Sequence, residues 1–228
     1  MVRQRAIQAE DKRERRDAIL DAAERLLLRS LERVANVAEV ADAAGLAKGT
    51  VYLYFPSKEE LLLGVHGRRI NAFFRAVIAL LERDTPTAFD DMLALVHLHM
   101  VEPPLFLPLA SRSFGLMAHS IPVEAAVAFK QRIAAGLERA GTGLERHFPQ
   151  LGRGGGVPLL RRSYALIIGL WQLSAEAGGD RMRTALTEAD ALPAVVWNYR
   201  TEMDRALRVL WQGTVGEPSA GATGEGRP

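Results

Sequence analysis

The chain has 228 residues, of which 48% are hydrophobic and 25% charged, and its formal net charge is +2. This composition is that of a globular protein, and the length allows either one core or two smaller domains. The absence of cysteine excludes disulfide scaffolds, cysteine-ligated metal centres and thiol nucleophiles. The longest apolar run, residues 164–173, is too short to span a bilayer, and the first sixteen residues are too charged for a signal peptide. We therefore expect a cytoplasmic protein with no membrane partner.

The N-terminal quarter of the chain carries no net charge. Positions 1–60 hold eleven Lys or Arg and eleven Asp or Glu, which argues against a diffuse polyanion binder. The basic residues near the start fit either a flexible arm over residues 1–11, which follows a nucleic-acid backbone, or an ordinary solvated surface. These residues are Arg3, Arg5, Lys12, Arg13, Arg15 and Arg16.

Apolar residues recur at helical spacing almost throughout, and no stretch alternates with period two, so the pattern predicts an all-α fold. Start and stop signals such as Asp11 with Glu14, Asn36, Gly45 and the prolines divide the chain into about nine helices. The predicted helices cover residues 11–30, 36–44, 47–55, 57–80, 86–100, 105–118, 122–148, 158–177 and 193–211. Residues 152–156 and 178–191 are predicted loops, the second with at most one weak turn, and 213–228 is a predicted disordered tail.

Residues 36–58 have the pattern of a helix-turn-helix, because two short predicted helices are separated by a turn that contains Gly45. The second helix of such a motif fits the major groove of DNA. We expect Val51 to face the core, while Gly49 allows the backbone to approach DNA closely. Polar side chains that can reach phosphates or base edges are those of Lys48, Thr50, Tyr54 and, at the start of the next helix, Lys58.

The segment 36–62, NVAEVADAAGLAKGTVYLYFPSKEELL, closely resembles the DNA-binding signature of the TetR family of bacterial transcriptional repressors. The resemblance implies a helix-turn-helix domain over 12–60 and a larger helical ligand-binding and dimerisation domain over 61–212. It also implies a homodimer that binds a double-stranded, pseudo-palindromic operator and a small-molecule inducer. Matched to the family signature, the DNA-binding candidates are Asn36, Ala47, Lys48, Gly49, Thr50, Tyr52, Tyr54 and Lys58.

Two of these candidates carry a qualification. Tyr52 is as consistent with a core aromatic as with a DNA contact. Ala47 stands where the family often has Ser or Thr, so the recognition helix lacks a cap worth about 1 kcal/mol.

Aromatic, Met and polar residues in the later helices are candidates for an inducer pocket, because such pockets are mostly apolar with few polar anchors. The break at Pro103 and Pro104 disturbs helix packing in the same region. The candidates are His97, Met100, Phe106, Arg112, Phe114, Met117, His119, Phe129 and Trp171. The same spacing also fits a plain core, and it indicates only an apolar or amphipathic ligand.

The last two predicted helices are the best candidates for dimerisation, because each carries a broad apolar stripe and Gly169 permits close crossing. The predicted interface residues are Leu160, Tyr164, Ile168, Trp171, Val196, Tyr199, Met203 and Leu207. The alternative is that both stripes belong to the core of one chain.

No constellation in the sequence points to catalysis, to a metal or to a cofactor. His97 and His99 are two residues apart, which points them in different directions on a helix. We therefore expect a ligand-released, homodimeric repressor that is not an enzyme. The alternative is a helix-turn-helix protein whose C-terminal domain binds a protein partner in place of a small molecule.

Overall fold

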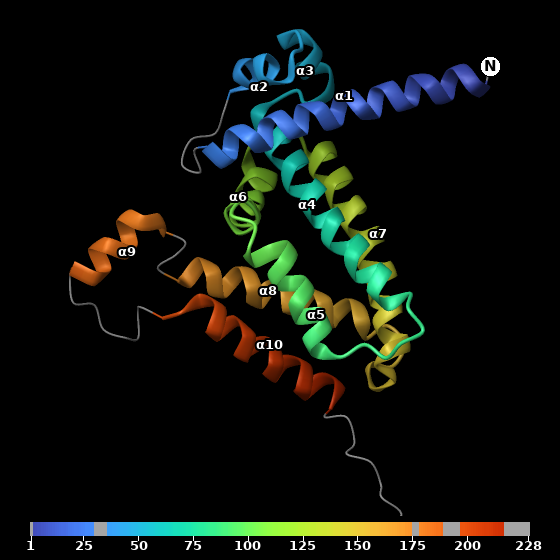
Figure 1. Ribbon diagram of the computed structural model, residues 1–228, viewed down its shortest axis with the longest axis vertical. Helices are drawn as coiled ribbons and strands as arrows, with labels where there is room; N and C mark the ends of the chain where they lie inside the picture. The colour runs from blue at the N-terminus through green and yellow to red at the C-terminus, as the bar shows by residue number, and fades with distance from the viewer. Residues whose placement is uncertain (1, 30–35, 175–177, 189–196, 217–228) are drawn as a thin grey trace, which may run out of the picture. The chain divides into compact units, whose positions relative to one another are not determined.

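The structure is a computed structural model that describes residues 2–29, 36–174, 178–188 and 197–216. Within these ranges it contains helices and no strand, which confirms the all-α prediction (Figure 1). The α-helices are α1 (Val2–Arg29), α2 (Val37–Ala44), α3 (Lys48–Tyr54), α4 (Lys58–Leu81), α5 (Phe89–Val96), α6 (Phe106–His119), α7 (Val123–His147), α8 (Gly156–Leu173), α9 (Gly179–Glu188) and α10 (Tyr199–Val215). A π-helical turn, η1 (His97–Val101), follows α5, and a 3₁₀ turn, η2 (Pro149–Leu151), follows α7.

The chain forms two compact units. The first comprises residues 1–73 and 96–135, and the second comprises residues 74–95 and 136–228. Helices α4 and α7 each contribute to both units, and the domain boundary that we expected at residue 60 stays a prediction.

The core of the first unit holds α1, α2 and α3 together. Val51 of α3 is fully buried and packs with apolar residues of α1 and α2, so α3 is anchored by its inner face. Leu105 and Leu109, at the start of α6, belong to the same cluster. The helix-turn-helix therefore shares its core with α6 within this unit.

Local signals explain where α2 and α3 begin and end. The side chain of Asn36 accepts a hydrogen bond from the N–H of Glu39 at 3.0 Å, and Glu39 accepts one from the N–H of Asn36 at 2.9 Å. This capping box satisfies donors that the first turn leaves open. Gly45 ends α2 with φ of 67°, a left-handed conformation that favours glycine. The predicted start and end of α2 are thus confirmed.

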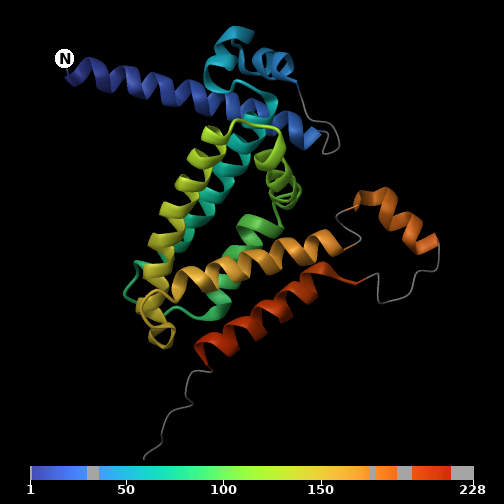
Figure 2. The same cartoon turned by 180° about the vertical axis from the view of Figure 1, so that it is seen from behind.

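The second unit is held together in part by α8 and α10, which lie side by side in both views (Figures 1 and 2). The hydroxyl of Tyr199 donates to the carbonyl oxygen of Ile167 at 3.1 Å. The indole N–H of Trp211 donates to the hydroxyl oxygen of Ser163 at 3.0 Å. These buried bonds fix the register of α10 on α8.

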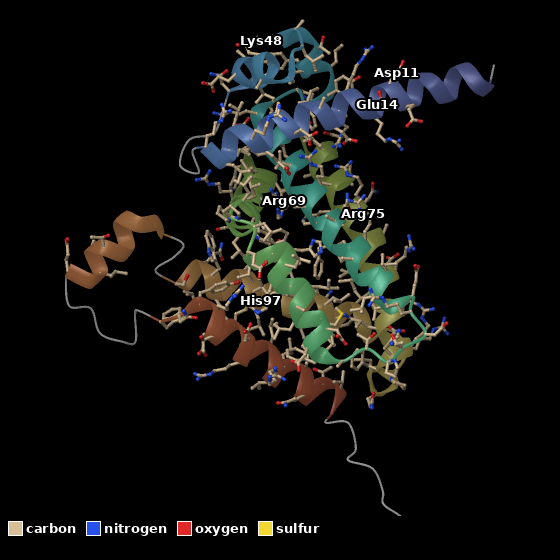
Figure 3. The ribbon with its side chains drawn as sticks, viewed as in Figure 1. Asp11, Glu14, Lys48, Arg69, Arg75 and His97 are labelled. Atoms are coloured by element: carbon tan, nitrogen blue, oxygen red, sulfur yellow. The ribbon has the colours of Figure 1, made fainter. Side chains whose placement is uncertain are left out.

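Two helix starts were predicted wrongly in the first half of the chain. The first helix begins at Val2, not at Asp11, so the expected arm is helical from Val2 onward, and Asp11 and Glu14 project from the middle of α1 (Figure 3). The fifth helix begins at Phe89, not at Pro86, because the N–H of Ala88 donates to the side chain of Asp91 at 2.8 Å. That bond caps the helix three residues after the proline.

The later helices also differ from the predicted ones. The segment over 178–191 contains the ten-residue helix α9, where we expected a loop. Helix α8 begins at Gly156 and ends at Leu173. Pro158 is its third residue, in the first turn, where the N–H that proline lacks would have no helical partner. Helix α10 begins at Tyr199 after the cap residue Asn198, so residues 197 and 198 are not helical, although we predicted a helix there. It runs to Val215, so the tail predicted from Gly213 is helical up to that residue. The predicted start at residue 193 and the tail from 217 lie outside the described residues.

None of the described helices is by itself both long and apolar enough to cross a membrane. The segments Phe89–Val101 and Phe106–His119, which form a bent pair, meet the criteria of length and composition only when they are taken together.

Candidate functional site

The outward face of α3 is the most clearly defined candidate surface. Four of its seven residues, namely Lys48, Gly49, Tyr52 and Leu53, are exposed, while Val51 on the opposite side is fully buried. A Cβ added at Gly49 would meet no atom within 4 Å, so nothing covers the backbone there. The face therefore combines a lysine ammonium group, a tyrosine ring, the uncovered backbone of Gly49 and the apolar side chain of Leu53.

Lys48 and Tyr52 lie one helical turn apart on this face. The ammonium nitrogen of Lys48 is 5.9 Å from the centroid of the Tyr52 ring, within the range of a cation–π interaction. Tyr52 is 41% exposed and is therefore a surface residue that orients a lysine. This exposure favours a surface position for Tyr52 over a position in the core. Lys48 is labelled at the outer side of the motif in Figure 3.

Thr50 and Tyr54 have a different setting, since both are half-buried and Tyr54 packs against the core of the first unit. Ala47 precedes α3 and makes no side-chain hydrogen bond, which confirms that the recognition helix has no side-chain cap. Asn36 is exposed, but its side-chain oxygen is already engaged in capping α2.

Lys58 lies at the first residue of α4, with its side chain 58% exposed and 3.7 Å from a carboxylate oxygen of Glu59. The hydroxyl oxygen of Ser57 accepts a hydrogen bond from the N–H of Glu60 at 3.1 Å and so caps the start of α4. The positive end of the α4 dipole and the Lys58 ammonium thus lie together, which suits an anionic group such as a phosphate.

One of the basic residues near the start of the chain, Arg16, lies against an aromatic ring of the core. The guanidinium carbon of Arg16 is 5.1 Å from the centroid of the Phe55 ring. Partial burial, together with the nearby charge of Arg132, lowers the pKa of Arg16 from its ordinary value. Arg16 therefore packs α1 on the end of α3 and is not an ordinary solvated surface residue.

The predicted pocket residues belong to both units and differ in exposure. Eight of the nine lie in the first unit and Trp171 lies in the second. Phe106, Phe129 and Met100 are buried, whereas Arg112, Phe114 and His119 are exposed. His97 and Met117 are half-buried, and so is Trp171.

Two of the buried candidates surround a residue that the sequence analysis missed. The His66 ring, on α4, lies 5.3 Å from the Phe106 ring and 6.3 Å from the Phe129 ring, measured between centroids. His66 is 1% exposed and its Nδ1 atom has no hydrogen-bond partner. Burial, aided by the charge of Arg69, lowers its pKa from 6.5 to about 4, so the ring is neutral near pH 7. Its position four residues after Leu62, on the buried stripe of α4, is the signal that could have identified it.

The predicted dimer residues are mostly occupied within their own chain. Met203, Tyr199 and Leu207 are 0%, 1% and 2% exposed, and Leu160 and Ile168 are also buried. These five side chains are buried within their own chain, where α8 packs on α10, and their place in a dimer interface stays a prediction. Tyr164 and Trp171 are half-buried, and burial raises the pKa of Tyr164 to about 12. Val196 lies outside the described residues.

A surface hollow of about 420 Å³ lies in the second unit, where α4 ends. Its floor is fixed by His147, whose Nε2 atom lies 2.9 Å from the carbonyl oxygen of Leu81. The lining is mainly charged, with Glu82, Arg83, Asp84 and Arg146, and it contains none of the predicted pocket residues. In the part of the chain that the structure describes, no three His, Asp or Glu side chains are grouped closely enough to hold a metal ion.

Two family models match two successive segments of the chain. Residues 19–65 match the model of the bacterial regulatory proteins of the tetR family, and residues 68–218 match the model of the tetracyclin repressor-like C-terminal domain. The HTH-type transcriptional repressor KstR of Mycobacterium tuberculosis (strain ATCC 25618 / H37Rv) is 41% identical over 63 residues. The aligned segment spans 28% of this chain and 29% of that protein.

The fold is similar to that of a solved repressor. The structure of SmeT, the repressor of the Stenotrophomonas maltophilia multidrug efflux pump SmeDEF, aligns with a TM-score of 0.51 at 20% identity. The alignment covers 93% of this chain and 96% of that one. The family match extends over most of the chain and includes the helix-turn-helix whose outward face is described above. The chain belongs to the TetR family of transcriptional regulators.

Proposed function

We propose that the chain is a repressor that binds a pseudo-palindromic DNA operator as a homodimer and is released by a small apolar or amphipathic ligand. The observation that carries the proposal is the outward face of α3, which is anchored from behind by Val51 and presents Lys48 and Tyr52 to solvent. A helix held in this way fits the major groove, and two copies about 34–36 Å apart read two half-sites. The protein then acts in the cytoplasm, where its operator lies.

Four side chains contribute to DNA binding in this proposal. Lys48, oriented by the Tyr52 ring, lies at the N-terminal end of α3 and reaches the phosphate backbone. Lys58 reaches a second phosphate at the start of α4. Thr50 and Tyr54, which are half-buried, offer hydroxyl groups at the edge of the same face.

A second copy of the chain is the partner that we propose for α8 and α10. Each helix has an outer apolar stripe besides the buried one: Leu166, Gly169, Leu170 and Leu173 on α8, and Ala206, Val209, Leu210 and Gly213 on α10. Leu173 and Val209 are 70% and 69% exposed. A Cβ added at Gly169 or Gly213 would meet nothing within 4 Å, which leaves room for a helix of another copy to approach closely.

The ligand-responsive element that we propose is the cluster of His66, Phe106 and Phe129. Its two aromatic rings suit an apolar ligand, and the Nδ1 atom of His66 is a buried polar group without a partner. Phe106 begins the helix whose neighbouring Leu105 and Leu109 pack into the core of the helix-turn-helix. A ligand that favours one position of α6 would thereby shift the motif, which requires only differential affinity for the two conformers.

DNA binding is tested with Lys58→Ala and a matched control, Lys130→Ala, which removes an exposed lysine from α7. Fluorescence anisotropy on an operator selected from random DNA should show weaker binding for Lys58→Ala. Because the proposed dimer loses two phosphate contacts, one per half-site, the slope of log K against log salt should be reduced by about 1.8. Lys130→Ala should bind like the wild type. Equal affinity and slope for all three proteins would contradict the assignment of Lys58.

The dimer is tested with Gly169→Arg and Gly115→Arg, because both glycines lie within helices and have open space at the Cβ position. Sedimentation equilibrium should show a dimer for the wild type and for Gly115→Arg, and a monomer for Gly169→Arg. A dimer that survives Gly169→Arg unchanged would place the interface elsewhere.

Ligand binding is tested by native mass spectrometry of protein purified from its source cells. A dimer with a discrete added mass of small-molecule size, lost in His66→Leu, supports the sensor proposal. A complex with the added mass of a protein, without any small-molecule mass, would favour the alternative in which the C-terminal domain binds a protein.

A further inference from the structure

Leu53 is the most exposed large apolar side chain in the described part of the chain, with 83% of its surface open to solvent. A single exposed leucine is common on protein surfaces and does not by itself indicate a binding site. This one, however, lies on α3, a helix of seven residues whose inner face is fixed by Val51 and whose outer face is the proposed DNA contact.

The neighbours of Leu53 leave its methyl groups uncovered. Side chains on a helix lean toward its N-terminus, so Leu53 leans over the residue four positions earlier, which is Gly49. Gly49 has no side chain, and a Cβ placed there would meet nothing within 4 Å. Lys48 is drawn to the ring of Tyr52, at 5.9 Å from its centroid, and therefore does not cover this spot.

An apolar side chain has only one partner to recognise in the major groove. Every base pair offers hydrogen-bond donors or acceptors there, but only thymine also presents a methyl group, at C5. Leucine can neither donate nor accept a hydrogen bond, so it cannot discriminate among the polar edges. The bare backbone at Gly49 allows the helix to approach closely enough for a van der Waals contact with a base.

We propose that Leu53 is a specificity-determining residue that selects thymine at one position of each half-site by packing against its C5 methyl group. The inference rests on the proposed function, since it requires α3 to enter the major groove. Flanking cations at Lys48 and Lys58 hold the phosphates on either side and bring this apolar tip to the base edges.

The test replaces each thymine of the selected operator half-site, one at a time, by deoxyuridine, which keeps the base pair and lacks only the C5 methyl group. Deoxyuridine at one of these positions should lower the affinity of the full-length wild-type protein about fourfold per half-site. This factor corresponds to the free energy of burying one methyl group. Leu53→Ala should bind the thymine and uracil operators with equal affinity. Leu98→Ala is the matched control, because Leu98 is a 56% exposed leucine outside the helix-turn-helix, and it should keep the preference for thymine.

The possible results separate this inference from the proposed function. If the wild type binds the operator specifically but no deoxyuridine weakens binding, the Leu53 inference is overturned and the proposed function stands. If Leu53→Ala still prefers thymine at the sensitive position, another side chain reads the methyl group and the inference is likewise overturned. If no sequence is selected from random DNA, the proposed function fails and the inference fails with it.

Discussion

Phe74 of α4 packs directly on Gly136 of α7, where a Cβ would lie only 2.6 Å from the Cδ2 atom of the ring. The same relation recurs seven residues away in each direction: Phe129 of α7 lies against Gly67 of α4, and Leu81 of α4 lies against Gly143 of α7. The two helices therefore run parallel with a constant register. At each contact a large side chain of one helix fills the space left by a glycine of the other.

Gly136→Ala should destabilise the protein because the new methyl group must displace the Phe74 ring. We expect a loss of about 1–3 kcal/mol in the free energy of unfolding, measured by urea denaturation. Gly115→Ala is the control, since Gly115 also lies within a helix but has open space around the Cβ position. Its higher helix propensity should leave stability unchanged or raise it by up to about 1 kcal/mol. Equal effects of the two variants would contradict the packing of Phe74 on Gly136.

The ion pairs between α1 and α4 predict a second stability difference. Arg68 contacts Asp21 at 2.5 Å and Glu24 at 2.7 Å, and Arg69 lies 3.4 Å from Glu24. The Arg68 and Glu24 side chains are only 25% and 20% exposed, so water screens this pair weakly. Glu24→Gln should cost about 1–2 kcal/mol of unfolding free energy.

The control for this pair is Glu82→Gln. Glu82 and Arg139 form a pair at 3.3 Å with side chains 59% and 69% exposed. An exposed pair of this kind contributes less than about 1 kcal/mol. A smaller loss for Glu24→Gln than for Glu82→Gln would show that α1 is not held to α4 by these contacts.

The sequence predicted those parts of the fold that local signals decide. Asn36, Gly45 and Val51 behave as expected, because caps, left-handed turns and buried faces depend on residues a few positions apart. The start at Phe89 was missed because two start signals compete there, and the cap by Asp91 prevails over the proline.

The sequence could not decide which partner covers an apolar stripe. Met203 and Leu207 lie on a stripe wide enough for a dimer, yet α8 of the same chain covers it, and the face free for a second copy is the weaker one around Gly213. Periodicity identifies a buried face but not the element that buries it.

The hydrogen bond from Trp211 to Ser163 predicts a third effect on stability. Ser163 is buried, and its hydroxyl also donates to the carbonyl oxygen of Leu159 at 2.9 Å. Ser163→Ala leaves the Trp211 N–H without this acceptor, which should cost about 1–3 kcal/mol. Ser113→Ala is the control, because Ser113 is equally buried and donates to Leu109 at 2.6 Å.

Thermal and urea unfolding of both serine variants would measure the difference. The loss in Ser163→Ala should exceed the loss in Ser113→Ala, and the indole N–H resonance of Trp211 should shift only in the first. Equal losses without a resonance shift would show that the Trp211 bond contributes nothing to the packing of α10 on α8.

The burial of His66 predicts a pH dependence of stability. Its pKa is about 4 in the folded protein and 6.5 ordinarily, so between these values the unfolded chain binds a proton that the native chain does not. The free energy of unfolding therefore falls as the pH decreases from 6.5 toward 4, by at most about 1.4 kcal/mol per pH unit from this group. Above pH 6.5 the contribution of His66 is complete and constant.

His66→Leu isolates this contribution, since it keeps an apolar side chain between Phe106 and Phe129 and removes the unpartnered Nδ1 atom. Urea denaturation at a series of pH values should show the variant losing less stability than the wild type between pH 6.5 and 4. Between pH 7 and 8 the two proteins should have parallel profiles, which serves as the internal control. If the profiles remain parallel down to pH 4, then His66 has the same pKa in the folded and in the unfolded protein. In that case His66 is not buried between Phe106 and Phe129 in solution, and it cannot serve as the proposed polar anchor of the ligand site.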